Sequence, residues 1–391
     1  APPAPKSPCA PERCGAAARD DVMDADDVVR LRLRRQRLRE PFAATAEDAL
    51  KNLLAVQSQE FAYARWTLAQ RSAGSTAAAV EQAVSDGTIL RTHILRPTWH
   101  FVHRDDLRWL LALSAPRLHQ GNAGMYRRTG LDAAEGAKSN RVLAGAVAGG
   151  AHKTREQLAE ALQTAGLAAE GLGLAYRIMY AEASGVLVSG SPVRSAGGAL
   201  KQTYALFEER VPAAPAPLMD RPAALAELVR RYFASRGPAT DRDCADWSGL
   251  TLADVRAGLG LVRESTPGTL ETVRIDGVDF HVGPEADITA AASDPPRIDL
   301  IQCYDEYVMG YSASRHYLGG EAPFAPVAGE PAHLVLRDGR LAGVWRHRFV
   351  RGRCELDIRL QSRTDPAMEA GIDAAVASYG SFLELPALRV G

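Results

Sequence analysis

Two glutamines, one residue apart, are the most unusual polar feature of this sequence. Gln57 and Gln59 stand between an apolar run that ends at Val56 and an aromatic run that begins at Phe61. An unpaired buried amide costs about 1–3 kcal/mol, so side chains in this setting need partners. A neutral amide cannot act as a general base at pH 7, but it can orient a water molecule. The structural alternative is that one amide caps a helix end and the other bonds a loop carbonyl.

A second polar pattern lies in RTHILRPTWHFVHR, residues 91–104. Its alternation with period two predicts a strand or hairpin, with Pro97 at an edge or bend. One face would then carry Arg96, Thr98 and His100 together. These side chains could hold a ligand, or they could be the solvent-facing residues of an edge strand, which are common in antiparallel sheets.

The remaining candidates are an acidic pair and a basic hairpin. Asp305 and Glu306 look like a metal-binding pair, but adjacent side chains diverge on a strand or a helix, so we predict no metal and no cofactor. Lys201, Gln202 and Tyr204 lie in KQTYALFEERV, where a wing is expected, and are candidates for phosphate contacts.

Length and composition limit the classes of protein. A chain of 391 residues with 46% hydrophobic content predicts two to four domains with ample core. Its five scattered cysteines lack metal-ligand spacing, which indicates thiols in a reducing cytoplasm. With 46 basic and 47 acidic residues, any nucleic-acid contact must come from a local patch. No apolar stretch approaches the 18 residues of a membrane span, and the N-terminus lacks the apolar region of a signal peptide.

Local signals divide the chain into repeated units. Thr154 is a plausible N-cap with Gln157 three residues later and Gly166 as a stop, and a second helix and a short hairpin follow. Helix, turn, helix and hairpin is the plan of a winged helix. The plan recurs after the Pro-rich linker at 211–222, where Thr251 opens a helix with Asp254 at its third position.

Beyond residue 266 the pattern favours strands. Asp-Gly pairs at 276–277 and 338–339 predict hairpins, and short strands with Gly turns suggest a small barrel or curled sheet before a closing helix. We therefore expect an α+β fold, mainly α with small β elements, in which tandem winged-helix modules and a β-barrel-like domain enclose a C-shaped cleft. The expected units are a disordered tail (1–27), three winged-helix modules (28–150, 151–212 and 213–265) and the β-barrel-like domain with its closing helix (266–391).

Five segments in register resemble a known family. They are LAVQSQEFAYARWTL, RTHILRPTWHFVHRDDLRWLLAL, KQTYALFEERV, RGPATDRDCADWSGL and CYDEYVMGYSASR. Together they resemble the winged-helix DNA glycosylases of the AlkZ type, over residues 28 to 388. The AlkZ-like branch carries a Gln-x-Gln motif as its catalytic signature, so the resemblance implies that Gln57 and Gln59 are the catalytic pair.

The resemblance also implies a substrate class. Amides that only orient water suffice for a base that leaves without protonation, and an N7-alkylguanine is already cationic. The expected enzyme is a monofunctional glycosylase, since no lysine stands in or beside the motif, and it acts on double-stranded DNA, including interstrand crosslinks. Arg96, Thr98 and His100 would contact phosphates or the alkylated base, and Asp305 would position water or pair with an arginine. We expect a cytoplasmic monomer.

A non-catalytic protein of the same fold is the alternative, either a transcription regulator or a drug-sequestering resistance factor. A regulator needs a recognition helix rich in base-reading residues. The segment GLGLAYRIMYAEASG offers Arg177 and little else, so the glutamine motif favours the enzyme.

Overall fold

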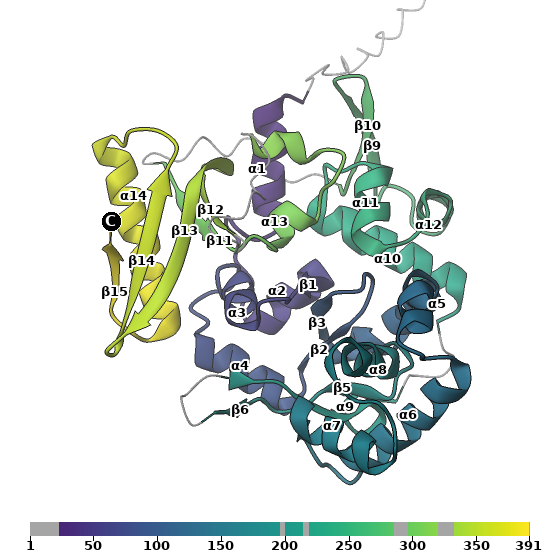
Figure 1. Cartoon of the computed structure of the whole chain (residues 1–391). Coiled ribbons are helices and arrows are strands. Elements are labelled where there is room, and N and C mark those ends of the chain that lie inside the picture. The colour runs from purple at the N-terminus through teal and green to yellow at the C-terminus, as the bar shows by residue number, and fades with distance from the viewer. Residues whose placement is uncertain (1–22, 196–199, 214–218, 285–295, 320–331, 391) are drawn as a thin grey trace, which may run out of the picture.

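The structure is a computed structural model, drawn in Figure 1. It describes residues 23–195, 200–213, 219–284, 296–319 and 332–390. Within these ranges, helices and small sheets follow one another as the α+β class requires. The predicted N-terminal tail lies outside the described residues up to position 22. Helix α1 (Ala25–Arg35) begins inside the bounds predicted for that tail, and Asp24 caps it.

The first winged-helix unit carries both glutamines. Its elements are α2 (Ala46–Leu53), β1 (Ala55–Gln57), α3 (Phe61–Ala69), α4 (Ala77–Asp86), β2 (Ile89–His93) and β3 (Trp99–His103). The strands form an antiparallel sheet in the order β1-β3-β2, which pairs Gln57 with His100. Thr45 caps α2, and Gly87 ends α4 at φ 78°, where glycine is favoured. The hairpin predicted around Pro97 is confirmed, with residues 94–98 as its loop.

The second unit repeats the plan after the long helix α5 (Arg104–Arg128). Its helices are α6 (Ala133–Val147), α7 (Arg155–Thr164), α8 (Gly171–Ala183) and α9 (Phe207–Arg210). Its strands are β4 (Lys153–Thr154), β5 (Leu187–Ser189), β6 (Val193–Arg194), β7 (Leu200–Lys201) and β8 (Thr203–Leu206). The predicted capping box of Thr154 and Gln157 is confirmed, and Gly166 stands just beyond α7 at φ 74°.

The third unit consists of α10 (Arg221–Arg236), α11 (Asp241–Ser248), α12 (Leu252–Ser265), β9 (Glu271–Ile275) and β10 (Val278–Val282). Capping boxes begin α11 at Thr240 and α12 at Thr251. The predicted turn at 276–277 joins β9 to β10, and a bridge between Ala239 and His281 ties this hairpin to the helices. Strand pairing therefore continues past residue 265, and the domain boundaries themselves stay a prediction. The predicted linker lies partly outside the described residues.

The C-terminal unit is one sheet with a covering helix. Its elements are β11 (Ile298–Ile301), α13 (Glu306–Met309), the 3₁₀ helix η1 (Arg315–Leu318), β12 (His333–Arg337), β13 (Arg340–Val350), β14 (Arg353–Leu360), α14 (Pro366–Leu383) and β15 (Ala387–Val390). The order is β11-β12-β13-β14-β15, and α14 packs on it around Trp345 and Ile372. In the described ranges β11 and β15 are edges, so this sheet is open rather than closed into a barrel.

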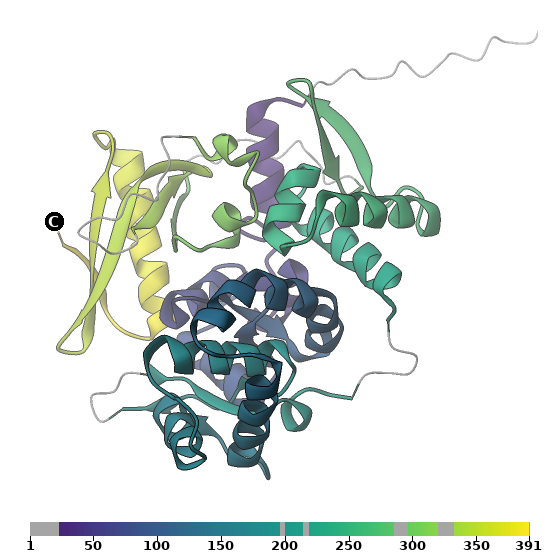
Figure 2. The ribbon, with the colours of Figure 1, turned by 45° about the vertical axis from the view of Figure 1, so that its right-hand side comes forward.

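Helix α1 joins the C-terminal unit to the third unit. In Figures 1 and 2 it stands between them, on the side of the molecule opposite the second unit. Its buried Arg32 donates to the carbonyl of Pro238 at 3.0 Å and to Ser314 Oγ at 2.6 Å. Segments distant in sequence thus meet at Arg32 of α1. The C-shaped cleft stays a prediction. Among the described helices, none is both long and apolar enough to cross a bilayer.

Candidate active site

The strand that carries Gln57 begins at a constrained turn. Leu54 is fully buried and has φ 66°, a conformation that a branched side chain seldom adopts. Arg236, at the end of α10, donates to the carbonyls on both sides of it, at 2.9 Å to Leu53 and 3.2 Å to Ala55. The third unit therefore fixes the way in which the chain enters β1.

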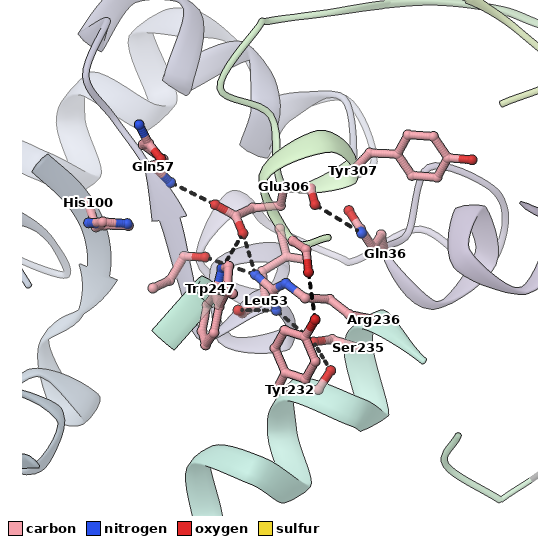
Figure 3. Close-up of polar contacts among 12 residues, drawn as sticks. Gln36, Leu53, Gln57, His100, Tyr232, Ser235, Arg236, Trp247, Glu306 and Tyr307 are labelled. Atoms are coloured by element: carbon pink, nitrogen blue, oxygen red, sulfur yellow. Dashed lines mark hydrogen bonds and ion pairs between the residues drawn. The ribbon is translucent and has the colours of Figure 1, made fainter. Parts of the chain in front are cut away.

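Glu306 holds the backbone of Gln57, as Figure 3 shows. Its Oε1 accepts the Gln57 N–H at 2.8 Å. Its Oε2 accepts Arg236 Nη2 at 2.6 Å and the Trp247 indole N–H at 2.8 Å. A fully buried ion pair needs further hydrogen bonds to offset its desolvation, and Gln57 and Trp247 donate such bonds to Glu306. The first, third and C-terminal units therefore meet at Gln57.

Arg96 binds the side chain of Gln57. Gln57 is 3% exposed, and its Oε1 accepts Arg96 Nη2 at 2.8 Å. Arg96 also donates to the carbonyl of Trp247, and its Nη2 lies 3.3 Å from His100 Nε2. Burial lowers the pKa of Arg96, which the nearby carboxylate of Glu306 opposes. The structure thus places Arg96 among interior partners.

His100 is fully buried behind Arg96. Burial and the positive charge of Arg96 hold the pKa of His100 well below its usual value, so the ring is neutral at pH 7. Its Nδ1 lies 2.9 Å from the carbonyl of Thr98, which can only accept. This partner assigns the ring hydrogen to Nδ1 and leaves Nε2 as an acceptor for Arg96.

Gln59 has different surroundings. Strand β1 ends at Gln57, and Gln59 is exposed in the loop beyond it. Arg91 holds this loop by donating to the carbonyls of Ser58, at 2.7 Å, and Gln59, at 3.2 Å. Gln59, Arg91, Lys201 and other residues of the first two units line a pocket of about 150 Å³, and Gln57 is not among its lining residues. The two amides therefore face different neighbours.

Comparison with known proteins identifies the family to which this chain belongs. A family model described as DNA glycosylase AlkZ-like matches residues 50–382, a span that includes both glutamines and Glu306. The chain belongs to the AlkZ-like DNA glycosylase family. It is 25% identical over 343 residues to the interstrand DNA cross-link repair glycosylase of Streptomyces sahachiroi, with 80% of this chain and 85% of that protein covered.

The fold comparison agrees. The structure of Streptomyces sahachiroi DNA glycosylase AlkZ matches this AlkZ-like chain with a TM-score of 0.69 and 21% identity, over 93% of this chain and 99% of that one. The resemblance noted from sequence motifs is confirmed, and the chain is a DNA glycosylase, an enzyme that acts on N-glycosyl bonds.

The other predicted DNA contacts of this AlkZ-like enzyme lie in varied settings. The hydroxyl of Thr98 is buried and has no hydrogen-bond partner among the described residues. Lys201 is half exposed and lies 3.5 Å from Glu156, and Gln202 accepts a hydrogen bond from Arg91. Tyr204 is 3% exposed in the core of the second unit, where burial raises the pKa of its hydroxyl. Of these side chains, that of Lys201 is the best placed for phosphate.

Asp305 and Glu306 diverge, as their adjacency predicted. Asp305 forms a bidentate, fully buried pair with Arg71 at 2.6 and 3.0 Å, while Glu306 pairs with Arg236. Of the two roles expected for Asp305, the structure contains the arginine pair. In the described ranges no group of three His, Cys, Asp or Glu side chains could hold a metal ion.

Sequence reasoning missed three residues that position Gln57 in this AlkZ-like enzyme. Arg236 and Trp247 were not singled out, and Glu306 was considered only as half of an acidic pair. All three stand in segments that carry the family resemblance, RGPATDRDCADWSGL and CYDEYVMGYSASR. The signal was therefore present, but the contact between Glu306 and Gln57 spans 249 residues of sequence, and Arg236 and Trp247 act through Glu306.

Proposed function

We propose that this chain is a monofunctional DNA glycosylase that hydrolyses the N-glycosidic bond of cationic N7-alkylguanine in double-stranded DNA. The observation that carries the proposal is the fixed, neutral amide of Gln57. Arg96 and Glu306 determine its position, and its own chemistry offers hydrogen bonds but no proton transfer at pH 7.

The proposed reaction needs no acid. When the C1′–N9 bond breaks, its electron pair passes to the positively charged purine, which leaves as the neutral alkylated base. The oxygen of a water molecule forms the new bond to the oxocarbenium-like C1′, and one proton is released to solvent. An unmodified purine would need acid assistance, typically about 10²–10⁴-fold in rate, which amides cannot supply.

A single hydrolytic step without strand cleavage is part of the proposal. Schiff-base lysines act as free amines and are usually desolvated. Lys201 shares a pocket with Gln59, but its side chain is 50% exposed and lies 3.5 Å from Glu156, so it is not desolvated. We therefore expect no covalent product when borohydride is added to the enzyme and its substrate, and a band that disappears in Lys201→Ala would contradict this.

Interstrand crosslinks are the finer part of the proposed substrate range. The relative from Streptomyces sahachiroi carries cross-link repair in its name. A base tethered to the opposite strand cannot be turned by about 180° into a closed pocket, so unhooking requires an open site. We expect bulky N7 adducts to be released nearly as fast as N7-methylguanine. A steep fall in rate with adduct size would limit the substrate to small lesions.

The transcription-regulator form of the non-catalytic alternative is weakened by the position of Arg177. Arg177 was the one base-reading side chain expected on the exposed face of the candidate recognition helix. It is 4% exposed and donates to the carbonyl of Ala168 and to Glu135. No second function is proposed.

The deciding experiment uses a duplex oligonucleotide with one N7-methylguanine. The protein is incubated with this duplex and with an unmodified duplex, abasic sites are cleaved with alkali, and the products are separated by length. We expect cleavage at the lesion alone and above the spontaneous rate. Binding without base release would overturn the proposed function in favour of a sequestering protein.

A further inference from the structure

The orientation of the Gln57 amide is determined by its neighbour. The oxygen and nitrogen of a glutamine amide look alike, so their positions have to be assigned from partners. Arg96 has only N–H donors, and therefore the atom that faces Arg96 Nη2 at 2.8 Å must be Oε1. A flipped amide would set donor against donor.

Arg96 is in turn fixed from two sides. The carbonyl of Trp247, which only accepts, takes one N–H of Arg96, and the lone pair of neutral His100 lies 3.3 Å from Nη2. Gly249 brings α11 close to the loop that carries Arg96, because a Cβ at this position would lie 2.5 Å from the carbonyl oxygen of Leu95. The arginine is held in place before any substrate arrives.

The amide nitrogen is the group that Gln57 has left to offer. None of the described residues forms a hydrogen bond with Nε2, and in Figure 3 the side-chain amide points away from Glu306. Because Gln57 is 3% exposed, the ligand that reaches Nε2 in this structure has to be as small as water.

Resting on the proposed function, we propose that Gln57 acts as a hydrogen-bond donor to the oxygen of the attacking water and that Arg96 is the positioning residue that enforces this polarity. Gln57 holds the water by one lone pair and leaves the other to attack C1′. It does not accept the hydrogen of the water, so the proton leaves by another route. Arg96 thereby serves Gln57 and not a DNA phosphate.

Two near-isosteric variants separate a donor from an acceptor. Gln57→Glu keeps the shape of the side chain and its oxygen acceptors but lacks the N–H donor. Gln57→Met keeps the shape but lacks both the oxygen acceptor and the N–H donor. If Gln57 donates, both variants lose about 10-fold or more in single-turnover release of N7-methylguanine at pH 7.5, in line with the loss of one oriented donor. If Gln57 accepts, Gln57→Glu keeps wild-type activity or exceeds it, and the proposal fails.

The dependence of the base-release rate on pH adds a second test. A purely structural role of Gln57 would not change this dependence. Protonation of the carboxylate that Gln57→Glu introduces restores an O–H donor, so the rate of this variant should rise as pH falls, after subtraction of the release seen with Gln57→Met. The wild-type rate should not show this rise. A flat profile for Gln57→Glu would overturn the donor assignment.

Arg96 is tested by a double-mutant cycle. Arg96→Met should lower base release about 10-fold in the wild type but have little further effect on Gln57→Met, and it should leave the salt dependence of DNA binding unchanged. Multiplicative losses, or a smaller salt slope, would make Arg96 a DNA contact instead. Arg96→Lys, which keeps the charge, and thermal melting distinguish loss of orientation from loss of folding. If the wild type releases no base, the proposed function is wrong. The rates of the Gln57 and Arg96 variants test only whether the Gln57 amide donates or accepts a hydrogen bond.

Discussion

Glu306 accepts the backbone N–H of Gln57 at 2.8 Å across 249 residues of sequence. The same carboxylate neutralises Arg236, which clamps the turn before β1. One buried side chain thus determines both where the strand begins and where its last residue lies.

We expect Glu306→Gln to reduce both stability and activity. Removing one partner of a buried ion pair leaves Arg236 uncompensated and typically costs about 3–5 kcal/mol, measured by urea unfolding. Asp305→Asn is the matched control, because it breaks the buried pair with Arg71 but does not touch Gln57. Per folded molecule, base release should fall in Glu306→Gln and not in Asp305→Asn. Equal losses in both would reduce Glu306 to a purely structural role.

Substitution of either glutamine should lower activity without disturbing the fold. Gln57→Ala and Gln59→Ala are each expected to lower single-turnover base release by about 10-fold or more. Each variant loses one oriented contact, and a loss of about 1.4 kcal/mol in transition-state stabilisation lowers the rate tenfold. DNA affinity, measured by fluorescence anisotropy, should stay within about 2-fold. Wild-type rates in either variant would remove that residue from the catalytic assignment.

Salt dependence should identify Lys201 as a phosphate contact. Lys201→Ala is expected to reduce the slope of log affinity against log salt by about 1, the signature of one lost phosphate contact. Tyr204→Phe is the control from the same hairpin region, because Tyr204 is buried and should leave the slope unchanged. An unaltered slope in Lys201→Ala would place the DNA path elsewhere.

Acid should destabilise the C-terminal unit through His333. Burial lowers the pKa of His333 to about 3, and the unfolded value is about 6.5. The unfolded state therefore takes up the proton first, so the stabilisation is present above pH 6.5 and is lost as pH falls toward 3. The loss is about 1.4 kcal/mol per pH unit for this group. Urea unfolding of wild type and His333→Gln at pH 7 and pH 5 should show a weaker pH dependence in the variant.

Local features were predictable because their causes are local. The capping boxes at Thr154 and Thr251 and the turns at 276–277 and 338–339 depend on residues within four positions of one another, and each is present. The strand alternation around Pro97 was predictable for the same reason.

The direction in which polar side chains face was not predictable. Period two indicated a strand but could not show that α11 of the third unit covers the loop with Arg96, or that His100 lies behind it. The role of Glu306 was equally hidden, since its partners come from three separate segments. Contacts between units determine the direction of these side chains, and a local sequence pattern carries no information about such contacts.

The order of synthesis determines when the turn at Leu54 gains the contacts that hold it. The first unit emerges from the ribosome long before residues 236 and 306, and domains generally fold as they emerge. Until Arg236 is synthesised, the carbonyls of Leu53 and Ala55, on either side of the strained Leu54, lack the hydrogen bonds that this side chain donates to them. Until Glu306 is synthesised, the N–H of Gln57 lacks its acceptor as well, so the contacts that position Gln57 are complete only late in synthesis.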